Sequence, residues 1–221
     1  MEFIARNTTI PVPRVLDFFE VNGQPHLVQE YIEGRILEDV WPKLTVEQRT
    51  DAVLQLKGYL DQLRSLPPPE FGRVQAVDGG TLSDGRIDLS RAWGPFGSHE
   101  EFGDFSFRGH VKRNLDKYPG AAELYGKVEG RKWKTVFAHG DLGPHNVIWK
   151  DGRIVAIIDW EFAGWFPEYW EYTRTFLVTG LFPQDENRCS FWKAFDSVVD
   201  RYPDELAIEQ LLAANFDGFY L

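Results

Sequence analysis

Apolar residues recur every three or four positions between residues 46 and 65, which is the period of an α-helix with one buried face. These positions are Val53, Leu56, Leu60 and Leu63. Thr45 and Gln48 have the spacing of a capping box, in which each side chain bonds the backbone N–H of the other residue. Three prolines from residue 67 to 69 close the segment. The pattern therefore predicts one long amphipathic helix.

Two segments have the pattern of a β-hairpin, with strand-forming residues on both sides of a two-residue turn. The first places strands at residues 15–19 and 26–29 around Asn22-Gly23. The second places strands at residues 147–149 and 154–158 around Asp151-Gly152. A short strand is also expected at residues 136–138, just before a polar loop.

The remaining segments are expected to be helical or irregular. The opening residues resemble the last turns of a helix that stops before two prolines, and residues 70–97 are rich in glycine and predict a long irregular connection. Ser98 and Glu101 form a second capping box, which opens a helix that carries Phe102, Phe105 and Val111. Helices are expected around residues 168–179, 184–202 and 204–216. The predicted class is α+β, with a mostly helical second half that contains one hairpin.

Composition and charge narrow the function. A chain of 221 residues with 43% apolar residues can fill a sizeable core, and its net charge of -10 argues against nucleic-acid and anionic-membrane partners. The single cysteine, Cys189, cannot form an internal disulfide, and no secretory leader is apparent, so a cytoplasmic protein is expected. The longest apolar run, residues 154–158, is too short to span a membrane. A small molecule is the expected substrate.

The loop FAHGDLGPHNVIW, residues 137–149, carries the candidate chemistry. Asp141 and Asn146 lie in the loop, and the following hairpin should return Asp159 to the same place. Magnesium prefers oxygen ligands of this kind and completes its shell with waters and phosphates. A base, a metal ligand and a second metal ligand form the set that phosphoryl transfer uses.

The same residues resemble the aminoglycoside phosphotransferase and choline kinase-like family, which is protein-kinase-like, and particularly its fungal branch. The matching segments, in the expected order, are TIPVPRVLDFF, VQEYIEG, AWGPFGSHEEF, HGDLGPHN and IIDWEFAGWFPEYWEY. The resemblance implies that Asp141 is the catalytic base, that His139 orients the loop, and that Asn146 and Asp159 hold Mg²⁺. It also implies that the backbone of Gln29, Glu30, Tyr31 and Ile32 meets the adenine of ATP, in a setting of secondary metabolism.

The resemblance further implies a division of the chain. Residues 1–34 would be a remnant of the amino-terminal lobe and hinge, and residues 35–221 a helical carboxyl-terminal lobe with its catalytic loop at 137–161. The family's phosphate-covering hairpin and lysine-bearing strand would precede the first residue. Residues 80–85 have glycine spacing but lack the lysine of a phosphate loop, so they predict a turn. A lobe without its full sheet would expose an edge that a second copy or another partner could cover.

Several roles stay open at this stage. Glu161 could lie in a second metal shell, act as an acid or base, or pair with an arginine such as Arg174, and the pairing is favoured. Trp165 and Phe166 are the aromatic residues assigned to a substrate pocket, while their aromatic neighbours are assigned to the core. Three functions fit: a Mg²⁺-dependent kinase of a small metabolite, a repurposed acid–base enzyme that works without ATP, and a non-catalytic pseudokinase or truncated gene product that binds a partner.

Overall fold

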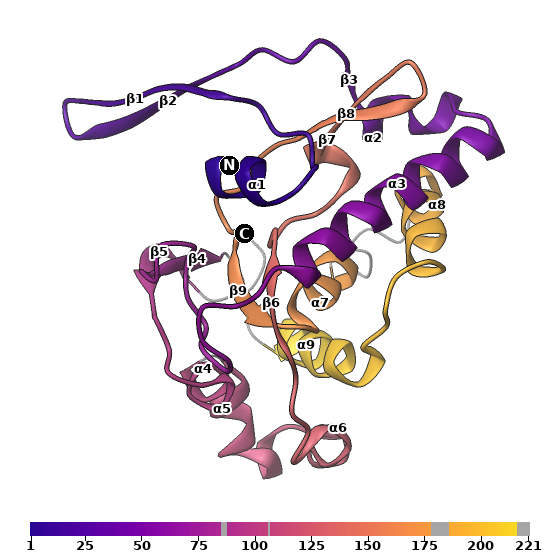
Figure 1. Ribbon diagram of the computed structural model, residues 1–221. Helices are drawn as coiled ribbons and strands as arrows, with labels where there is room; N and C mark the ends of the chain where they lie inside the picture. The colour runs from indigo at the N-terminus through magenta and orange to yellow at the C-terminus, as the bar shows by residue number, and fades with distance from the viewer. Residues whose placement is uncertain (85–87, 106, 178–185, 216–221) are drawn as a thin grey trace. The chain divides into compact units, whose positions relative to one another are not determined.

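The computed structural model describes residues 1–84, 88–105, 107–177 and 186–215, and Figure 1 shows the path of the chain. By compactness it divides into two units. Unit 1 comprises residues 1–63, 142–160 and 185–199, and unit 2 comprises residues 64–141, 161–184 and 200–221. Each unit is therefore assembled from three separate pieces of the sequence. The predicted boundary at residues 34/35 concerns the ancestry of the segments and stays a prediction.

The structure confirms both predicted hairpins and adds a third strand to one of them. The first segments, in chain order, are α1 (Glu2–Asn7), β1 (Val15–Val21), β2 (Gln24–Gln29), β3 (Arg35–Ile36), α2 (Leu37–Val40), the 3-10 turn η1 (Trp41–Lys43) and α3 (Val46–Ser65). β1 pairs antiparallel with β2. β3 pairs with β7 (Val147–Lys150), which pairs with β8 (Arg153–Ile157). Asn22 and Asp151 both have positive φ, as the two-residue turns require.

Helix α3 forms for the reasons that its sequence suggests. The backbone N–H of Thr45 donates to Gln48 Oε1 at 3.0 Å, and the N–H of Gln48 donates to Thr45 Oγ1 at 3.2 Å, so the capping box is present. All four predicted apolar positions are buried. The core of unit 1 also contains Trp41, which packs edge-on against Phe191 of α8 (Glu186–Asp196) with ring centroids 4.9 Å apart.

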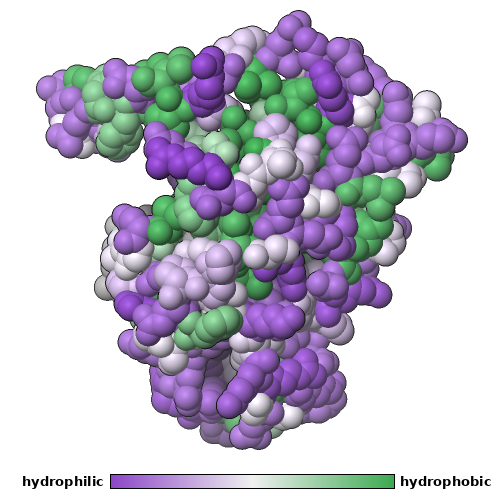
Figure 2. All heavy atoms as spheres, viewed as in Figure 1, coloured by the Kyte–Doolittle hydropathy of each residue, from purple (hydrophilic) through white to green (hydrophobic). Residues whose placement is uncertain are grey.

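The β1–β2 hairpin carries exposed apolar side chains on both strands, and Figure 2 shows them as hydrophobic areas among hydrophilic ones. These residues are Leu16, Phe18, Phe19, Val21, Leu27 and Val28. Such an area favours a partner, and the expectation that a second copy or another protein covers it stays a prediction.

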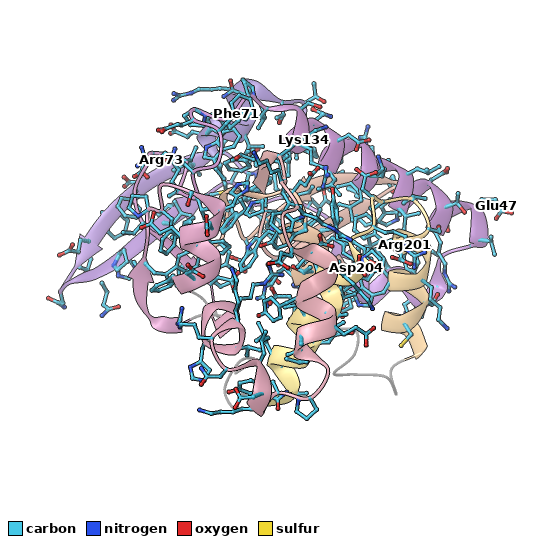
Figure 3. The ribbon with its side chains drawn as sticks, turned by 90° about the horizontal axis from the view of Figure 1, so that it is seen from below. Glu47, Phe71, Arg73, Lys134, Arg201 and Asp204 are labelled. Atoms are coloured by element: carbon cyan, nitrogen blue, oxygen red, sulfur yellow. The ribbon has the colours of Figure 1, made fainter. Side chains whose placement is uncertain are left out.

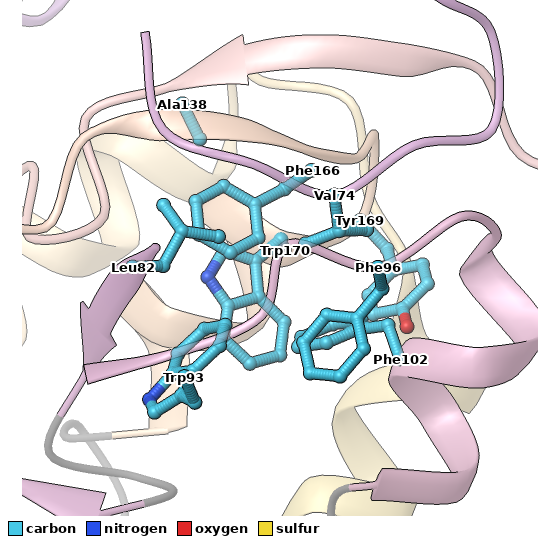
Figure 4. Close-up of a cluster of buried hydrophobic side chains, with 9 residues drawn as sticks. All are labelled: Val74, Leu82, Trp93, Phe96, Phe102, Ala138, Phe166, Tyr169 and Trp170. Carbon is cyan, nitrogen blue, oxygen red and sulfur yellow. The ribbon is translucent and has the colours of Figure 1, made fainter. Parts of the chain in front are cut away.

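Unit 2 is built on two short antiparallel sheets. β6 (Thr135–Ala138) pairs with β9 (Gly164–Pro167), and β4 (Leu82–Asp84) pairs with β5 (Asp88–Trp93). Aromatic residues from β5, β9 and their neighbours pack into one buried cluster, shown in Figure 4. The rings of Phe166 and Trp170 stack 5.2 Å apart. The sheets are therefore held together mainly by aromatic packing.

Most helices of unit 2 form a second cluster. They are α5 (Phe107–Lys112), the 3-10 turn η2 (Leu115–Lys117), α6 (Ala121–Val128), α7 (Trp170–Leu177) and α9 (Pro203–Asn215), whereas α4 (His99–Phe105) contributes Phe102 to the first cluster. Their shared apolar residues include Val111, Ala121, Leu177, Ile208 and Leu212. Figure 3 shows the side chains from below and labels Asp204 near the start of α9. Asp204 forms an ion pair with Arg131. No described helix is both long and apolar enough to cross a membrane.

Several predictions for unit 2 are wrong. The region at residues 70–97 contains the β4–β5 hairpin, and strand β9 and helix α6 were not predicted. β9 is buried on both faces, so it lacks the alternation that marks a half-exposed strand. The N–H of Glu101 donates to Ser98 Oγ at 3.0 Å, as in the predicted capping box, but Glu101 Oε2 accepts the N–H of Gly97 at 2.7 Å instead of that of Ser98. The predicted turn at residues 80–85 is also wrong, because Leu82–Asp84 form β4. Gly85 and the predicted helix ends at residues 178–179, 184 and 216 lie outside the described residues.

Candidate active site

The predicted site residues divide between the two units, and each set is described in its own unit. His139, Asp141 and Glu161 belong to unit 2, whereas Asn146 and Asp159 belong to unit 1. In unit 2, the loop leaves β6 after Ala138, which pairs with Gly164 at the start of β9. Residues 139–141 and 161–163 thus leave and enter the same end of one two-stranded sheet.

The backbone of the loop is fastened to helix α7 by a buried carboxylate. Glu171 is 3% exposed, and its Oε2 accepts the N–H of His139 and the N–H of Gly140, the latter at 3.1 Å. A buried anion is tolerated only where donors satisfy it, and two backbone donors do so here. The side chain of Glu171 therefore fixes the start of the loop relative to the helix.

Inside the loop, His139 and Gly140 set the position of Asp141. His139 is fully buried, and its Nδ1 accepts the N–H of Asp141 at 3.2 Å, so this nitrogen carries no proton in that contact. Gly140 has φ +85°, and a Cβ at this position would lie 2.6 Å from the carbonyl oxygen of Phe162. Only glycine fits both the conformation and the close approach. The orienting role of His139 stays a prediction.

Arg174 lies one turn further along α7 than Glu171, and its side chain contacts the same loop. Its Nε donates to the carbonyl oxygen of Gly140 at 3.0 Å, and its Nη2 lies 3.6 Å from Asp141 Oδ1. The guanidinium also lies 5.7 Å from the centre of the Phe162 ring. The carboxylate of Asp141 keeps 25% of its side-chain surface exposed and can meet an incoming molecule.

In unit 1, Asn146 precedes the first strand of the β7–β8 hairpin and Asp159 follows the second. Both residues therefore lie at the end of the hairpin opposite its turn. Asn146 ends the 3-10 turn η3 (Pro144–Asn146) just before β7, and Asp159 follows β8 by two residues. The N–H of Ile158 donates to the carbonyl oxygen of Asn146 at 3.0 Å, which joins the two ends. Asp159 is exposed and has φ +62°, a conformation that aspartate tolerates better than most residues.

The donor chemistry of this pair fits magnesium. Among the described residues, no group of three or more His, Cys, Asp or Glu side chains could hold a metal ion. Magnesium, however, is commonly held by one or two protein oxygens together with substrate phosphates and water. A carboxylate and an amide oxygen at the open end of one hairpin meet that requirement.

Residues 29–32, the segment predicted to meet a nucleotide, begin at the last residue of β2 and continue into the loop after it. The N–H of Glu30 donates to the carbonyl oxygen of Arg14 at 2.8 Å, and Arg14 Nε lies 3.0 Å from Glu30 Oε2. The Arg14 side chain, by hydrogen bonding, lowers the pKa of the Glu30 carboxyl. Tyr31 is 87% exposed. Glu30 is thus held by residue 14 through both its backbone and its side chain.

One expectation for unit 2 needs revision. Trp165 and Phe166 were assigned to a pocket, but they are 2% and 0% exposed and belong to the core, because both faces of β9 are covered. Arg174, the arginine suggested for Glu161, contacts Asp141 and Gly140. Glu161 is exposed, and its proposed roles stay predictions.

Glu171 was missed by sequence reasoning. Its signal is a charged residue within the aromatic run Trp170-Glu171-Tyr172, where burial of a carboxylate demands nearby donors. The sequence does not reveal that those donors are backbone groups of residues 139 and 140.

Comparison with known proteins shows which family the chain resembles. The model described as the phosphotransferase enzyme family matches residues 1–188. No curated protein matches the chain at a significant level. The solved structures that the chain resembles include several aminoglycoside phosphotransferases.

A thermostable mutant of aminoglycoside phosphotransferase APH(4)-Ia in its apo form has 17% identity and a TM-score of 0.62, and the match covers 95% of this chain and 70% of that chain. A thermostable mutant of the same protein in a ternary complex with ADP and hygromycin B has 17% identity and a TM-score of 0.57, over 98% and 76% of the two chains. APH(3'')-Id from Streptomyces rimosus has 17% identity and a TM-score of 0.52, over 96% and 77%.

At this level of identity the structures establish the fold, which is the α+β, kinase-like fold predicted from the sequence. The family match covers most of the chain, including the whole loop at residues 137–149. The chain therefore belongs to the phosphotransferase enzyme family.

Proposed function

We propose that this protein transfers the γ-phosphoryl group of ATP to a hydroxyl or amine group of a small metabolite. The observation that carries the proposal is the loop at residues 139–141. Its backbone is held by a buried carboxylate, a glycine that nothing else can replace, and an arginine, while the Asp141 carboxylate remains accessible. Such a fixed, accessible carboxylate is suited to accept a proton from an acceptor group.

In the proposed reaction, Asp141 Oδ accepts the proton of the acceptor hydroxyl or amine as the acceptor atom bonds to the γ-phosphorus. The bond between that phosphorus and the β,γ-bridging oxygen breaks, and ADP leaves with the electron pair. Asn146 and Asp159 would hold Mg²⁺, which supplies charge neutralisation for the phosphates. Residues 29–32 would bind the adenine through their backbone.

The molecule that accepts the phosphoryl group is proposed from the relatives and from the charge of the chain. The relatives of known structure include aminoglycoside phosphotransferases, and one of these is described in complex with ADP and hygromycin B. For this chain we propose a small metabolite, with a cytoplasmic reaction in fungal secondary metabolism as suggested by the resemblance of its motifs. The net charge of -10 is consistent with a small-molecule acceptor rather than a nucleic acid.

The first experiment is a thermal melt of the purified protein with MgCl₂ alone, with ATP alone and with both. A ligand present at about a hundred times its dissociation constant stabilises the folded state by about 2.7 kcal/mol. We expect a clear rise in Tm with MgATP and a smaller one with ATP alone. Asp159→Ala should remove the difference between them, because it deletes a metal ligand.

Asp141→Asn separates binding from chemistry. Because Asp141 is the proposed base and not a metal ligand, this variant should keep the MgATP shift and lose phosphoryl transfer in an acceptor screen. If MgATP shifts neither protein, phosphoryl transfer is refuted. Turnover of a metabolite without nucleotide and in the presence of a chelator would then identify an acid–base enzyme, and loss of that turnover in Asp141→Asn would assign the same carboxylate to it.

A further inference from the structure

Arg174 contacts both the backbone of the candidate catalytic loop and the side chain of Asp141. Its guanidinium is held at two points that are independent of Asp141: a 3.0 Å hydrogen bond from Nε to the Gly140 carbonyl oxygen, and the face of the Phe162 ring at 5.7 Å. Only 15% of the Arg174 side chain is exposed. An arginine that is held in this way presents its remaining N–H groups in a fixed direction.

That direction leads to the Asp141 carboxylate, whose Oδ1 lies 3.6 Å from Arg174 Nη2. This separation is that of an ion pair and is slightly too long for a direct hydrogen bond. The neighbouring carboxylate, Glu171, accepts the N–H groups of residues 139 and 140, and His139 accepts the N–H of Asp141. Within unit 2, Arg174 is thus a cation that faces the Asp141 side chain.

Glu171 and Arg174 lie three residues apart on α7, so both side chains can contact the same loop. Glu171 receives donors from the backbone of the loop, whereas Arg174 donates to the next backbone carbonyl and reaches the side chain beyond it. A change in the orientation of α7 would therefore move the backbone and the carboxylate of the loop together. The helix functions as a rigid support for the reactive group.

We infer that Arg174 is a positioning residue, which holds the Asp141 carboxylate in its ionised form and in one orientation through its simultaneous contact with Gly140. This inference rests on the proposed function for its catalytic consequence, but the Arg174–Asp141 interaction itself can be tested without any substrate. The opposite charge favours ionisation of the carboxylate. The hydrogen bond to the backbone supplies the fixed geometry.

The first test follows the ionisation of Asp141 by carboxyl-carbon NMR of protein labelled with ¹³C-aspartate, with Asp141→Asn used to assign the signal. In Arg174→Gln, the titration of the Asp141 signal should move to higher pH, because the carboxylate loses the facing cation. Arg174→Lys should restore much of the wild-type titration, because it keeps the charge. Arg113→Gln, which removes an exposed arginine from the same unit, should leave the titration unchanged. An unchanged Asp141 titration in folded Arg174→Gln overturns the inference.

The second test uses Arg174→Lys and covers the case in which Arg174→Gln does not fold. The probe is hydrolysis of MgATP with water as the acceptor. A single ammonium group cannot hold the Gly140 carbonyl and the Asp141 carboxylate at once, so kcat should fall by about 10- to 100-fold while the KM for ATP stays unchanged. An unchanged kcat in Arg174→Lys overturns the positioning role.

The two proposals fail in distinguishable ways. If wild-type protein shows neither a MgATP-dependent rise in Tm nor hydrolysis, phosphoryl transfer is refuted, and the NMR titration still decides whether Arg174 controls Asp141. If MgATP binds and is hydrolysed but the titration and kcat are insensitive to residue 174, the proposed function stands and the role of Arg174 is refuted.

Discussion

Gly140 is the position in the loop that tolerates substitution least. Its φ is +85°, and an added Cβ would lie 2.6 Å from the Phe162 carbonyl oxygen and 2.8 Å from the Phe162 Cβ. Gly140→Ala should lose about 1–2 kcal/mol for the left-handed conformation alone, and the clash adds to this loss. Gly152→Ala is the matched control, because Gly152 has φ +81° but no atom within 4 Å of its added Cβ. Urea denaturation should show a larger loss for Gly140→Ala, and equal losses would contradict the clash.

His99 gives a residue-level prediction for pH. Burial lowers its pKa, and the charge of Glu168 offsets this only in part. Because the unfolded chain binds the proton more readily, the contribution of His99 to stability is fully present above about pH 6.5 and is lost as the pH falls through the lowered folded pKa. The free energy of unfolding should therefore decrease less steeply from pH 7 to pH 5 in His99→Gln than in wild type.

The control for this prediction is His26→Gln, which removes an exposed histidine from the β1–β2 hairpin. The pH dependence of this variant is the reference with which that of His99→Gln is compared. If His99→Gln and wild type lose stability in parallel, protonation of His99 is not coupled to folding. His99 Nε2 lies 3.1 Å from Thr135 Oγ1, at the start of β6, so the effect would originate at the strand that leads to the loop.

Among the elements, α3 offers a direct test of local sequence signals. Thr45→Ala removes the side chain that caps the helix and should cost about 1 kcal/mol of stability. Thr50→Ala is the control in the same helix, because its hydroxyl bonds back to the carbonyl oxygen of Val46 at 2.9 Å and contributes no cap. Thermal and urea denaturation should show a loss for Thr45→Ala and little change for Thr50→Ala. A larger loss for Thr50→Ala would contradict the assigned helix start.

Strand β9 is an element whose formation depends on segments that are distant in the sequence. Gly164 pairs with Ala138, and its added Cβ would lie 2.8 Å from the Gln75 carbonyl oxygen, so the strand is enclosed by segments that are distant in sequence. Its pattern of residues carries no alternation, because every position is buried. A local reading of the sequence could not identify it as a strand.

For the whole of unit 2, a buried ion pair joins helices that are distant in the chain. Arg108 Nε of α5 lies 2.7 Å from Glu209 Oε1 of α9, and the two side chains are 10% and 3% exposed. Removal of one partner leaves an uncompensated buried charge, so Glu209→Ala should destabilise the protein by about 3–5 kcal/mol. Guanidinium denaturation measures this loss.

The double variant Arg108→Met with Glu209→Leu tests the reason for that loss. Because it removes both charges and retains apolar volume, it should be closer to wild type than Glu209→Ala is. If the single and double variants are equally unstable, packing at these positions matters more than charge compensation. In either case the result concerns the joining of α5 to α9 within unit 2.

The sequence by itself determined the features that depend on neighbouring residues. The capping box at Thr45, the two-residue turns at Asn22-Gly23 and Asp151-Gly152, and the apolar face of α3 are all local, and the structure confirms them. Motif order along the chain also pointed to the phosphotransferase family, which the family match shows. The assignments of Asp141, Asn146 and Asp159 are local motif assignments too, and their catalytic roles stay proposals.

Only the tertiary structure decided which distant groups meet. It brings Glu171 and Arg174 of α7 to a loop more than thirty residues earlier, buries Trp165 and Phe166 in β9, and pairs β4 with β5. The physical reason is that burial and long-range pairing depend on what covers a residue, and that information is spread over the chain. Local propensity specifies how a segment begins and ends, whereas packing specifies which of its side chains remain accessible for chemistry.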